Sequence, residues 1–255
     1  VLDDVVSDKV PYGRAKEAVE RSISWATRCI TQWERQEKHS SQEKYQALFG
    51  IVQGARFRDL REQSTDWILQ QSFDGIAIGG ELIGYSMEAT EEIMSWLLPK
   101  LPKDKPRYAM GLGRDPQNII DAVRWGFDMF DCVGPSRLAR NGALFVGRFE
   151  GSQDPDTWKF ESEFPKGRLS ISQARWKQDF QVLDENCGCL CCSQGYTRAY
   201  LHHLYRTGEL AYYRLATIHN LFVMLSISHR MQELMVMGHN GTTNHDNPTR
   251  TKKKA

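Results

Sequence analysis

Short apolar runs of strand type alternate with stretches of helical periodicity through the first half of this chain. The runs span Leu2–Val6, Ala47–Val52, Gly75–Ile78, Arg107–Leu112 and Met129–Val133. Between them, apolar residues recur with helical spacing over Ala15–Trp33 and, less regularly, over Asp59–Gln71. Ser86 is a candidate N-cap for the next helix, and Asp115-Pro116 is a typical start for the one after it. Strands that alternate with helices predict βαβ units and a parallel sheet, so we expect an α/β fold.

The number of βα units favours part of a barrel. About five units fit either an open doubly wound sheet or a piece of an eight-stranded barrel. A complete barrel takes about 250 residues for its eight units, whereas these five occupy residues 1–146. The chain has no initiating Met and begins inside the first run. We therefore expect the C-terminal part of a (β/α)8 TIM barrel, in a partial chain that lacks the N-terminal part.

The remaining residues follow a different pattern. Residues 147–168 are polar, contain Gly and Pro, and predict an inserted loop, and Leu169–Phe180 predicts an edge strand. Two helical stretches follow, at about 198–206 and 211–233. We expect 147–237 to comprise the inserted loop, a subdomain around a cysteine cluster and closing helices. Residues 238–255 are rich in Asn, Thr and Lys without periodicity, which predicts a disordered tail.

Composition excludes several classes of protein. Lys and Arg number 33 and Asp and Glu 32, so the net charge is +1, and any RNA contact must come from a local patch. The apolar share of 40% and the charged share of 25% are those of a globular chain rather than a disordered one. No apolar run reaches the roughly 18 residues that a membrane span needs, and no signal peptide is evident. We expect no membrane contact and a cytoplasmic location.

Polar or backbone-exposing residues stand at the end of each strand run. They are Asp3-Asp4, Gln53-Gly54, Gly79-Gly80, Met110-Gly111 and Asp131. In a βα barrel the carboxyl ends of the strands converge on the active site. Carboxylate and amide groups pair with a purine edge, glycine backbone adds N–H donors, and a methionine lies on a ring face. Asp and Gly are also ordinary turn residues, but five such strand ends together favour a pocket for a planar heterocyclic base.

Four cysteines lie close together, at Cys187, Cys189, Cys191 and Cys192. Such clustering without a secretory signal is typical of metal binding in a reducing compartment rather than of disulfides. Three thiolates and an imidazole suit tetrahedral zinc and leave no open position, so we expect a structural Zn²⁺. Cys191 and Cys192 compete for the third thiolate place. The set that we predict is Cys187, Cys189, Cys192 and His219.

A further motif couples Asp131 to a Gly-Pro turn and to two arginines three residues apart, Arg137 and Arg140. Arginines of this kind suit phosphate groups or guanine edges. Alone, the motif would indicate a solvated surface loop. Beside the strand-end residues it favours contact with a nucleic acid.

The order and spacing of these motifs resemble those of the tRNA-guanine transglycosylase (queuine/preQ1 tRNA-ribosyltransferase) family, from Val1 to about Met231. The matching segments are LDDVV (2–6), GIVQG (50–54), FDGIAIGG (73–80), DKPRYAMGLG (104–113), GFDMFDCVGPSRLARNG (126–142), CGCLCC (187–192), TRAYLHHL (197–204) and ATIHN (216–220). The resemblance implies a TIM barrel with a zinc subdomain. It also implies a pentosyltransferase of queuosine biosynthesis, which replaces guanine at the wobble position of tRNAs with GUN anticodons by a 7-deazaguanine, preQ1 or queuine.

The resemblance also implies roles for individual residues. Asp131 matches the family's nucleophile, whose attack on the ribose gives a covalent enzyme–RNA intermediate. The residues that match the base-binding set are Asp3, Gln53, Gly80, Met110 and Gly111. Those that match tRNA-contacting positions are Gly111, Arg114, Asp115, Gln117, Ser136, Arg137 and Arg140. The target base must leave its stack to reach Asp131, so the anticodon loop is the natural substrate. The family also implies a homodimer.

The sequence departs from the family pattern at several positions. The family's general base, a second Asp on an earlier strand, has no match here, so we expect this chain as given to lack full activity. Glu81 stands where the family has a Leu, and Tyr85 where it has a Glu. Val5 resembles the eukaryotic members, which use queuine. The Glu81 carboxylate could instead pair with the ammonium group of preQ1, and this gain favours preQ1.

One alternative belongs to a different functional class: a non-catalytic, tRNA-binding partner subunit of a transglycosylase heterodimer. Asp3, Gln53 and Asp131 together argue against it, because an inactive partner has no need of all three. The archaeal type of enzyme, which acts on the tRNA D-arm, is a further candidate, but it usually carries an additional RNA-binding domain that finds no match here.

Overall fold

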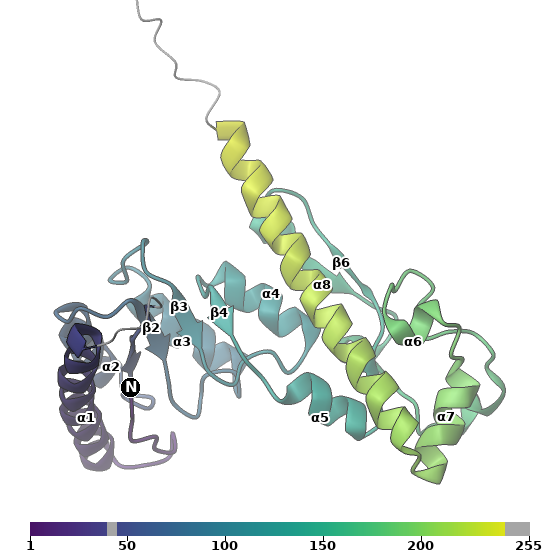
Figure 1. Cartoon of the computed structure of the whole chain (residues 1–255), viewed down its shortest axis with the longest axis horizontal. Coiled ribbons are helices and arrows are strands. Elements are labelled where there is room, and N and C mark those ends of the chain that lie inside the picture. The colour runs from purple at the N-terminus through teal and green to yellow at the C-terminus, as the bar shows by residue number, and fades with distance from the viewer. Residues whose placement is uncertain (40–44, 243–255) are drawn as a thin grey trace, which may run out of the picture. The chain divides into compact units, whose positions relative to one another are not determined.

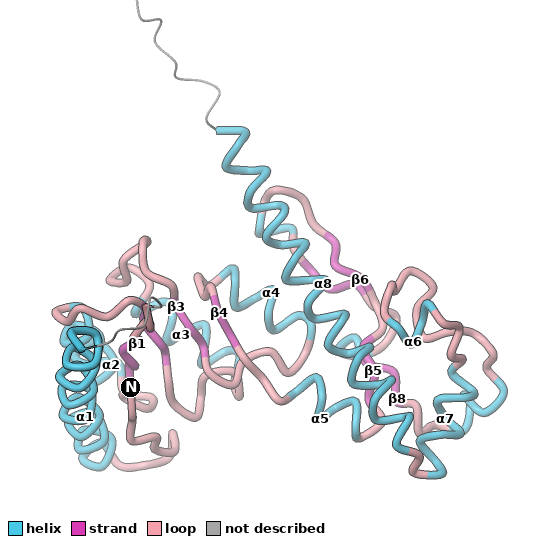
Figure 2. Tube along the Cα trace, viewed as in Figure 1, coloured by secondary structure: helices cyan, strands magenta, loops and turns pink. Residues whose placement is uncertain are grey.

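The structure is a computed structural model that describes residues 1–39 and 45–242. The chain separates into two compact units, a first unit from Val1 to Pro135 and a second unit that starts at Ser136. The trace shows strands alternating with helices in the first unit (Figure 2). In the described ranges, no helix combines the length and the apolar character that crossing a membrane requires.

The first unit is built on a parallel sheet. Its strands within the described residues are β1 (Phe49–Val52), β2 (Gly75–Ile78), β3 (Arg107–Ala109) and β4 (Met129–Phe130), in that spatial order (Figure 1). Parallel pairing places Phe49 beside Gly75, Ile76 beside Arg107 and Tyr108 beside Met129. The predicted α/β class with a parallel sheet is therefore confirmed. Since the strands run the same way, the residues that follow them share one edge of the sheet.

A helix connects each strand of this sheet to the next. The helices are α2 (Arg58–Leu69), α3 (Met87–Leu97) and α4 (Pro116–Arg124), and α1 (Tyr12–His39) precedes β1. Both predicted helix starts are confirmed. Ser86 Oγ accepts a hydrogen bond from the Ala89 N–H at the start of α3, and Asp115 and Asn118 form a capping box at the start of α4. All four residues of β2 are buried, as a strand covered on both faces should be.

The prediction of a strand at Leu2–Val6 is wrong. This segment is irregular, and side chains of α1 hold it in place. The Asp4 carboxylate pairs with Arg14 and Arg21, and the Asp4 N–H donates to Ser22 Oγ at 2.9 Å. A strand needs its backbone groups in a ladder with a neighbouring strand, and here the backbone N–H of Asp4 bonds to a side chain instead. Within the described residues the sheet therefore has four strands rather than five.

The second unit contains two antiparallel strand pairs. β5 (Ala143–Phe145) pairs with β8 (Arg168–Ser170), and β6 (Arg148–Glu150) pairs with β7 (Lys159–Glu161). The expected loop at 147–168 thus contains a hairpin, whose strands are too short and too charged to show alternation. The predicted edge strand ends early, at Ser170. Short 3-10 turns span Pro155–Thr157, Pro165–Gly167 and Ala174–Gln178.

Helices complete the second unit. They are α6 (Leu190–Ser193), α7 (Arg198–Thr207) and α8 (Leu210–Thr242), while α5 (Gly134–Arg140) begins at the boundary between the units. Both predicted helical stretches are confirmed, and Gly208 ends α7 in a left-handed conformation with φ +73°. The predicted tail is partly wrong, because α8 continues to Thr242. Residues 243–255 lie outside the described residues.

Candidate active site and metal centre

Asp3 and Gln53 lie in contact at the carboxyl edge of the parallel sheet. Gln53 follows β1, is 2% exposed, and its Nε2 donates to Asp3 Oδ2 at 2.5 Å. Its backbone N–H donates to Ser64 Oγ on α2 at 3.1 Å. Both ends of Gln53 are therefore fixed, and the pair presents hydrogen-bond donors and acceptors of the kind that a purine edge requires.

The turn after β2 lies close to Gln53. A Cβ on Gly79 would lie 2.6 Å from Gln53 Nε2, and one on Gly80 would lie 2.7 Å from Arg61 Nη2. Gly80 also has a φ of +112°, in the region that favours glycine. Neither position has room for a side chain, so bare backbone stands beside the Asp3–Gln53 pair and can approach a ligand closely.

Arg61 of α2 is completely buried beneath this turn. Its Nη1 donates to the carbonyls of Gly79 (2.6 Å) and Val52 (3.3 Å), and its Nε donates to that of Ala55 (2.9 Å). Loss of hydration on burial lowers the pKa of Arg61 to about 10, which still leaves it charged at neutral pH. Among residues 1–39 and 45–242, no carboxylate forms an ion pair with Arg61 and its Nη2 has no hydrogen-bond partner.

Asp131 follows β4 and is exposed, with one carboxylate oxygen held in place. Its Oδ1 accepts hydrogen bonds from Tyr108 Oη at 2.5 Å and from the Gly111 N–H at 3.4 Å. The hydrogen bond to Asp131, with some burial, raises the pKa of Tyr108 to about 12, so Tyr108 is a neutral donor at physiological pH. In the part of the chain that the structure describes, Oδ2 accepts no hydrogen bond. Asp131 thus has one anchored oxygen and one available for chemistry.

The other predicted base- and RNA-binding residues lie around these strand ends or on α5. Met110, half-buried, and Gly111 follow β3, Arg114 is exposed, and Asp115 caps α4. Gln117 is already engaged, since its Nε2 donates to Asp121 Oδ1 at 2.8 Å. Three further residues belong to α5 in the second unit: Ser136, Arg137 and Arg140, of which both arginines are exposed. The structure therefore brings together Asp3, Gln53 and Gly80, and it joins Asp131 to Gly111.

A Cys3His group lies in the second unit. The ligand atoms of Cys187, Cys189, Cys192 and His219 all lie within 4.8 Å of one another. His219 Nδ1 is 3.7, 3.4 and 3.5 Å from the sulfurs of Cys187, Cys189 and Cys192. Around a tetrahedral zinc ion with Zn–S and Zn–N bonds of about 2.3 and 2.05 Å, such atoms would lie about 3.5 Å apart. The arrangement therefore fits zinc, and Cys191 is not part of it.

Hydrogen bonds from neighbouring groups orient these four residues and shift their pKa values. His219 Nε2 lies 2.6 Å from the Phe145 carbonyl oxygen, which directs Nδ1 toward the sulfurs. Burial lowers the pKa of His219, but hydrogen bonds with Cys187, Cys189 and Phe145 outweigh it and raise the pKa to about 9. Hydrogen bonds from Cys187 and Cys192 lower the pKa of Cys189 far below its usual range. A metal ion must displace the protons that remain on the Cys3His group. The affinity of the group for the metal therefore decreases as the pH is lowered.

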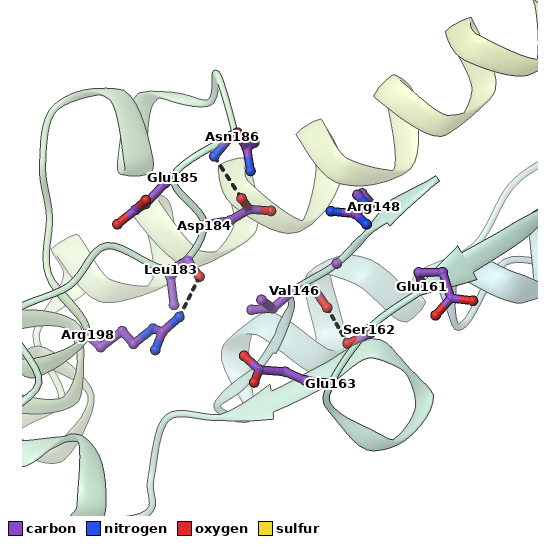
Figure 3. Close-up of a pocket in the computed structure, with 11 residues that line it drawn as sticks. Val146, Arg148, Glu161, Ser162, Glu163, Leu183, Asp184, Glu185, Asn186 and Arg198 are labelled. Carbon is purple, nitrogen blue, oxygen red and sulfur yellow. Dashed lines mark hydrogen bonds between the residues drawn. The ribbon is translucent and has the colours of Figure 1, made fainter. Parts of the chain in front are cut away.

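A cavity of about 550 Å³ opens elsewhere in the second unit (Figure 3). The charged residues that line it are Arg148, Glu161, Glu163, Asp184, Glu185 and Arg198. Arg198 is already held by Asp179 and by the Leu183 carbonyl. The carboxylates outnumber the arginines, so this cavity is poorly suited to the phosphates of an RNA backbone.

Tyr108, Arg61 and Ser64 were not among the residues predicted from the sequence. Tyr108 could have been found, because alternate residues of a strand share a face and Met110 was already a candidate. Arg61 gave a weaker signal, as a charged residue within the buried face of an amphipathic helix. Nothing in the sequence indicates that it contacts the carbonyls of Val52 and Gly79.

Comparisons with known proteins all match this chain to one family. The model of the family described as queuine tRNA-ribosyltransferase matches residues 1–242. A queuine tRNA-ribosyltransferase of Bacillus pumilus is 39% identical over 222 residues, which cover 87% of this chain and 51% of the relative. Those of Natranaerobius thermophilus and Helicobacter pylori are 38% and 40% identical, and the matches cover 91% and 89% of this chain and 56% and 54% of the relatives. The chain spans about half the length of the curated relatives it matches.

Proposed function

This chain belongs to the queuine tRNA-ribosyltransferase family, and we propose on that premise that its protein is a tRNA-guanine transglycosylase. The enzyme exchanges guanine at the wobble position of tRNAs with GUN anticodons for a 7-deazaguanine, in queuosine biosynthesis. The observation that carries the proposal is Asp131, an exposed carboxylate at a strand end with one oxygen anchored and the other available.

Asp131 is the nucleophile of this reaction. Its Oδ2 attacks the ribose C1′, a C1′–O bond forms, and the C1′–N9 bond breaks with its electron pair leaving on guanine. Hydrogen bonds from Tyr108 and Gly111 to Oδ1 orient the carboxylate. The expelled guanine takes up a proton at N9, and the incoming base gives up its own N9 proton as it attacks C1′. Asp131 then leaves as the carboxylate, so the exchange conserves protons. An intermediate of this kind conserves the energy of the glycosidic bond, so no other energy source is needed.

Asp3 and the residues that follow the strands contact the base. The Asp3 carboxylate accepts hydrogen bonds from the donors of a guanine edge, while Gln53 and the backbone of Gly80 meet the remaining polar atoms. Met110 packs on the ring face, and a Cβ on the neighbouring Gly111 would meet no atom within 4 Å. Donors and acceptors at fixed places reject bases with another edge pattern, because a buried polar group would then stay unpaired.

The remaining predicted polar residues contact the RNA. Arg137 and Arg140 lie one helical turn apart on α5 and are exposed. Arg114 and Asp115 at the start of α4, Gln117 and Ser136 complete the set. With a net charge near zero, these local arginines supply the attraction for the anticodon loop. A tRNA substrate agrees with the cytoplasmic location expected from the sequence.

The Cys3His group holds a structural zinc ion. Cys187, Cys189, Cys192 and His219 would supply all four ligands, which leaves no position for a substrate or a reactive water. The ion would hold the segment of α6 against α8. Its chemistry is therefore that of a fold stabiliser.

The domain organisation and the oligomeric state that we propose are those that the family resemblance implies. Residues 1–146 form part of a (β/α)8 barrel, and 147–237 belong to the zinc subdomain with the closing helices. The protein forms a homodimer, and exposed apolar residues of α8, among them Leu221, Phe222 and Leu225, support this.

The incoming base in this proposal is preQ1 rather than queuine. Glu81 is exposed, and hydrogen bonds from Ser7 and from the backbone of Asp8 hold its pKa below the usual value. An ionised carboxylate beside the pocket attracts the ammonium group of preQ1. Val5 is the feature that favours queuine, so both bases belong in the experiment.

The test is release of labelled guanine from tRNA by the full-length gene product, with preQ1 and queuine offered separately. We expect release with preQ1, and a covalent protein–tRNA adduct that survives denaturation. Asp131→Asn should abolish both signals. Asp128→Asn, which removes a carboxylate from the other end of β4 where it pairs with Arg107, should retain them.

Two other outcomes would contradict parts of this proposal. Release with queuine alone would overturn the choice of preQ1. No release with either base, from a folded protein that still binds tRNA, would overturn the catalytic function in favour of a non-catalytic partner subunit.

A further inference from the structure

Arg61 is buried in full although no carboxylate in the described ranges pairs with it. Burying a guanidinium without a counter-ion is costly, so its hydrogen bonds must account for its position. Those bonds go to the carbonyls of Val52, Ala55 and Gly79, which follow or end β1 and β2. The charge of Arg61 therefore ties α2 to the edge of the sheet where Asp3 and Gln53 lie.

The contact with Gly79 fixes the direction of the next N–H group. The Gly79–Gly80 peptide is trans, so the N–H of Gly80 points away from the C=O of Gly79. Since that C=O faces Arg61 at 2.6 Å, the N–H faces away from the guanidinium. Within residues 1–39 and 45–242 this N–H donates to no acceptor. An oriented, unused donor therefore stands beside Gln53.

The chemistry of the proposed bases identifies the acceptor. Gly80 N–H can only donate, and the Asp3 carboxylate can only accept. Guanine presents two acceptors, O6 and N7, on its major-groove edge. A 7-deazaguanine has carbon in place of N7 and keeps only O6 there. The exocyclic carbonyl oxygen is therefore the acceptor shared by the outgoing and the incoming base.

We propose that Arg61 is a positioning residue of the base site, which holds the Gly79–Gly80 peptide so that the Gly80 N–H donates to the exocyclic carbonyl oxygen of the base. The inference rests on the proposed function. Arg61 acts through Gly79 and does not touch the base. Its Nη2, 2.7 Å from where a Cβ of Gly80 would lie, also keeps that position a glycine.

The test compares the binding of guanine and 6-thioguanine without tRNA, by calorimetry on the full-length gene product. The two bases have the same N–H donors. In 6-thioguanine, however, sulfur replaces the exocyclic oxygen, and sulfur is a weak hydrogen-bond acceptor. Wild type should prefer guanine by about tenfold, the effect of one good hydrogen bond. Arg61→Lys keeps a charge but has one nitrogen in place of the two that bond to Ala55 and Gly79, so the preference should fall below about threefold.

Thr65→Val is the matched control. Thr65 is equally buried on the same face of α2, and its hydroxyl bonds to the Arg61 carbonyl within the helix rather than to the Gly79–Gly80 turn. It should lower stability without changing the preference for guanine. Circular dichroism and the melting temperature establish that each variant is folded at the temperature of the titration.

Each result of the titrations supports or contradicts the positioning role of Arg61. If folded Arg61→Lys keeps the full preference, or weakens both bases equally, Arg61 is a purely structural residue and the inference is wrong. If wild type binds neither base, the proposed function fails instead. If Arg61→Lys does not fold, Arg61→Gln replaces it, since the shorter neutral side chain cannot keep all of the bonds to Val52, Ala55 and Gly79. Loss of the preference then supports the inference, and retention overturns it.

Discussion

Tyr108 orients the carboxylate of Asp131, the nucleophile of the proposed reaction, through a hydrogen bond. Tyr108→Phe removes the shorter of the two hydrogen bonds to Asp131 Oδ1 and leaves the ring in place. We expect the rate of base exchange to fall by about tenfold, because a hydrogen bond to a charged group contributes roughly 1.5 kcal/mol. Single-turnover release of labelled guanine measures this rate. Tyr85→Phe, at an exposed tyrosine, is the control, and an unchanged rate in Tyr108→Phe would contradict the orienting role.

The same hydrogen bond predicts a dependence of stability on alkaline pH. The pKa of Tyr108 is raised from 10 to about 12 in the folded protein. Between these values the unfolded chain loses the Tyr108 proton first, so the folded state binds more protons and the free energy of unfolding falls as pH rises. The stability that the bond contributes is complete below pH 10 and is lost toward pH 12. Melting curves of wild type and Tyr108→Phe should therefore converge over this range, and a constant gap would contradict the assignment.

At the scale of elements, the short helix α6 places two adjacent cysteines in different surroundings. Cys192 is a ligand candidate 3.5 Å from His219 Nδ1, whereas Cys191 is fully buried in the apolar core of the second unit. Cys192→Ser should lose zinc and more than about 3 kcal/mol of unfolding free energy, since apparent zinc-binding free energies in zinc-dependent domains begin near 10 kcal/mol. Cys191→Ser should retain zinc and lose about 1–3 kcal/mol for burying a hydroxyl. Elemental analysis and denaturant unfolding test the pair, and zinc loss in Cys191→Ser alone would reverse the assignment.

Elements with strong local signals could be predicted from the sequence, and those held by distant side chains could not. The caps at Ser86 and Asp115 fixed the starts of α3 and α4 correctly because the capping bonds are local. Leu2–Val6 was mistaken for a strand because its anchor, the pairing of Asp4 with Arg14 and Arg21, joins residues that are 10 and 17 positions apart. The ladder of β5 with β8 likewise depends on pairing across a long connection, whereas the strands of the β6–β7 hairpin are too short to show alternation.

The same distinction applies to the candidate site. Gln53, Gly80 and Asp131 could be proposed because strand ends converge in any parallel sheet, whatever the detailed packing. Asp3 was proposed on the same ground, but it lies in an irregular segment and reaches Gln53 without a strand of its own. The partners that orient them, Ser64, Arg61 and Tyr108, come from packing between elements. Periodicity shows that Arg61 is on a buried face, but only the folded chain shows which carbonyls it meets.

For the whole molecule, the proposed homodimer rests on α8, which leaves several apolar side chains exposed. Leu221, Phe222, Leu225, Met235, Val236 and Met237 are each more than a third exposed. Apolar area of this extent on one helix favours burial against a partner, and we proposed that the partner is a second copy of the chain. A closed two-fold contact would then bring the same helix from each protomer into the interface.

Leu225→Asp tests this assembly. Leu225 is 58% exposed, so the change costs the folded protomer little, but a carboxylate buried twice in a two-fold interface would weaken the dimer by several kcal/mol. Light scattering after size exclusion should show a dimer for wild type and a monomer for Leu225→Asp at micromolar concentration. Leu210→Asp makes the same change at an exposed position at the start of α8 and should leave the dimer intact. A wild-type monomer, or a dimer that survives Leu225→Asp, would show that α8 serves another contact.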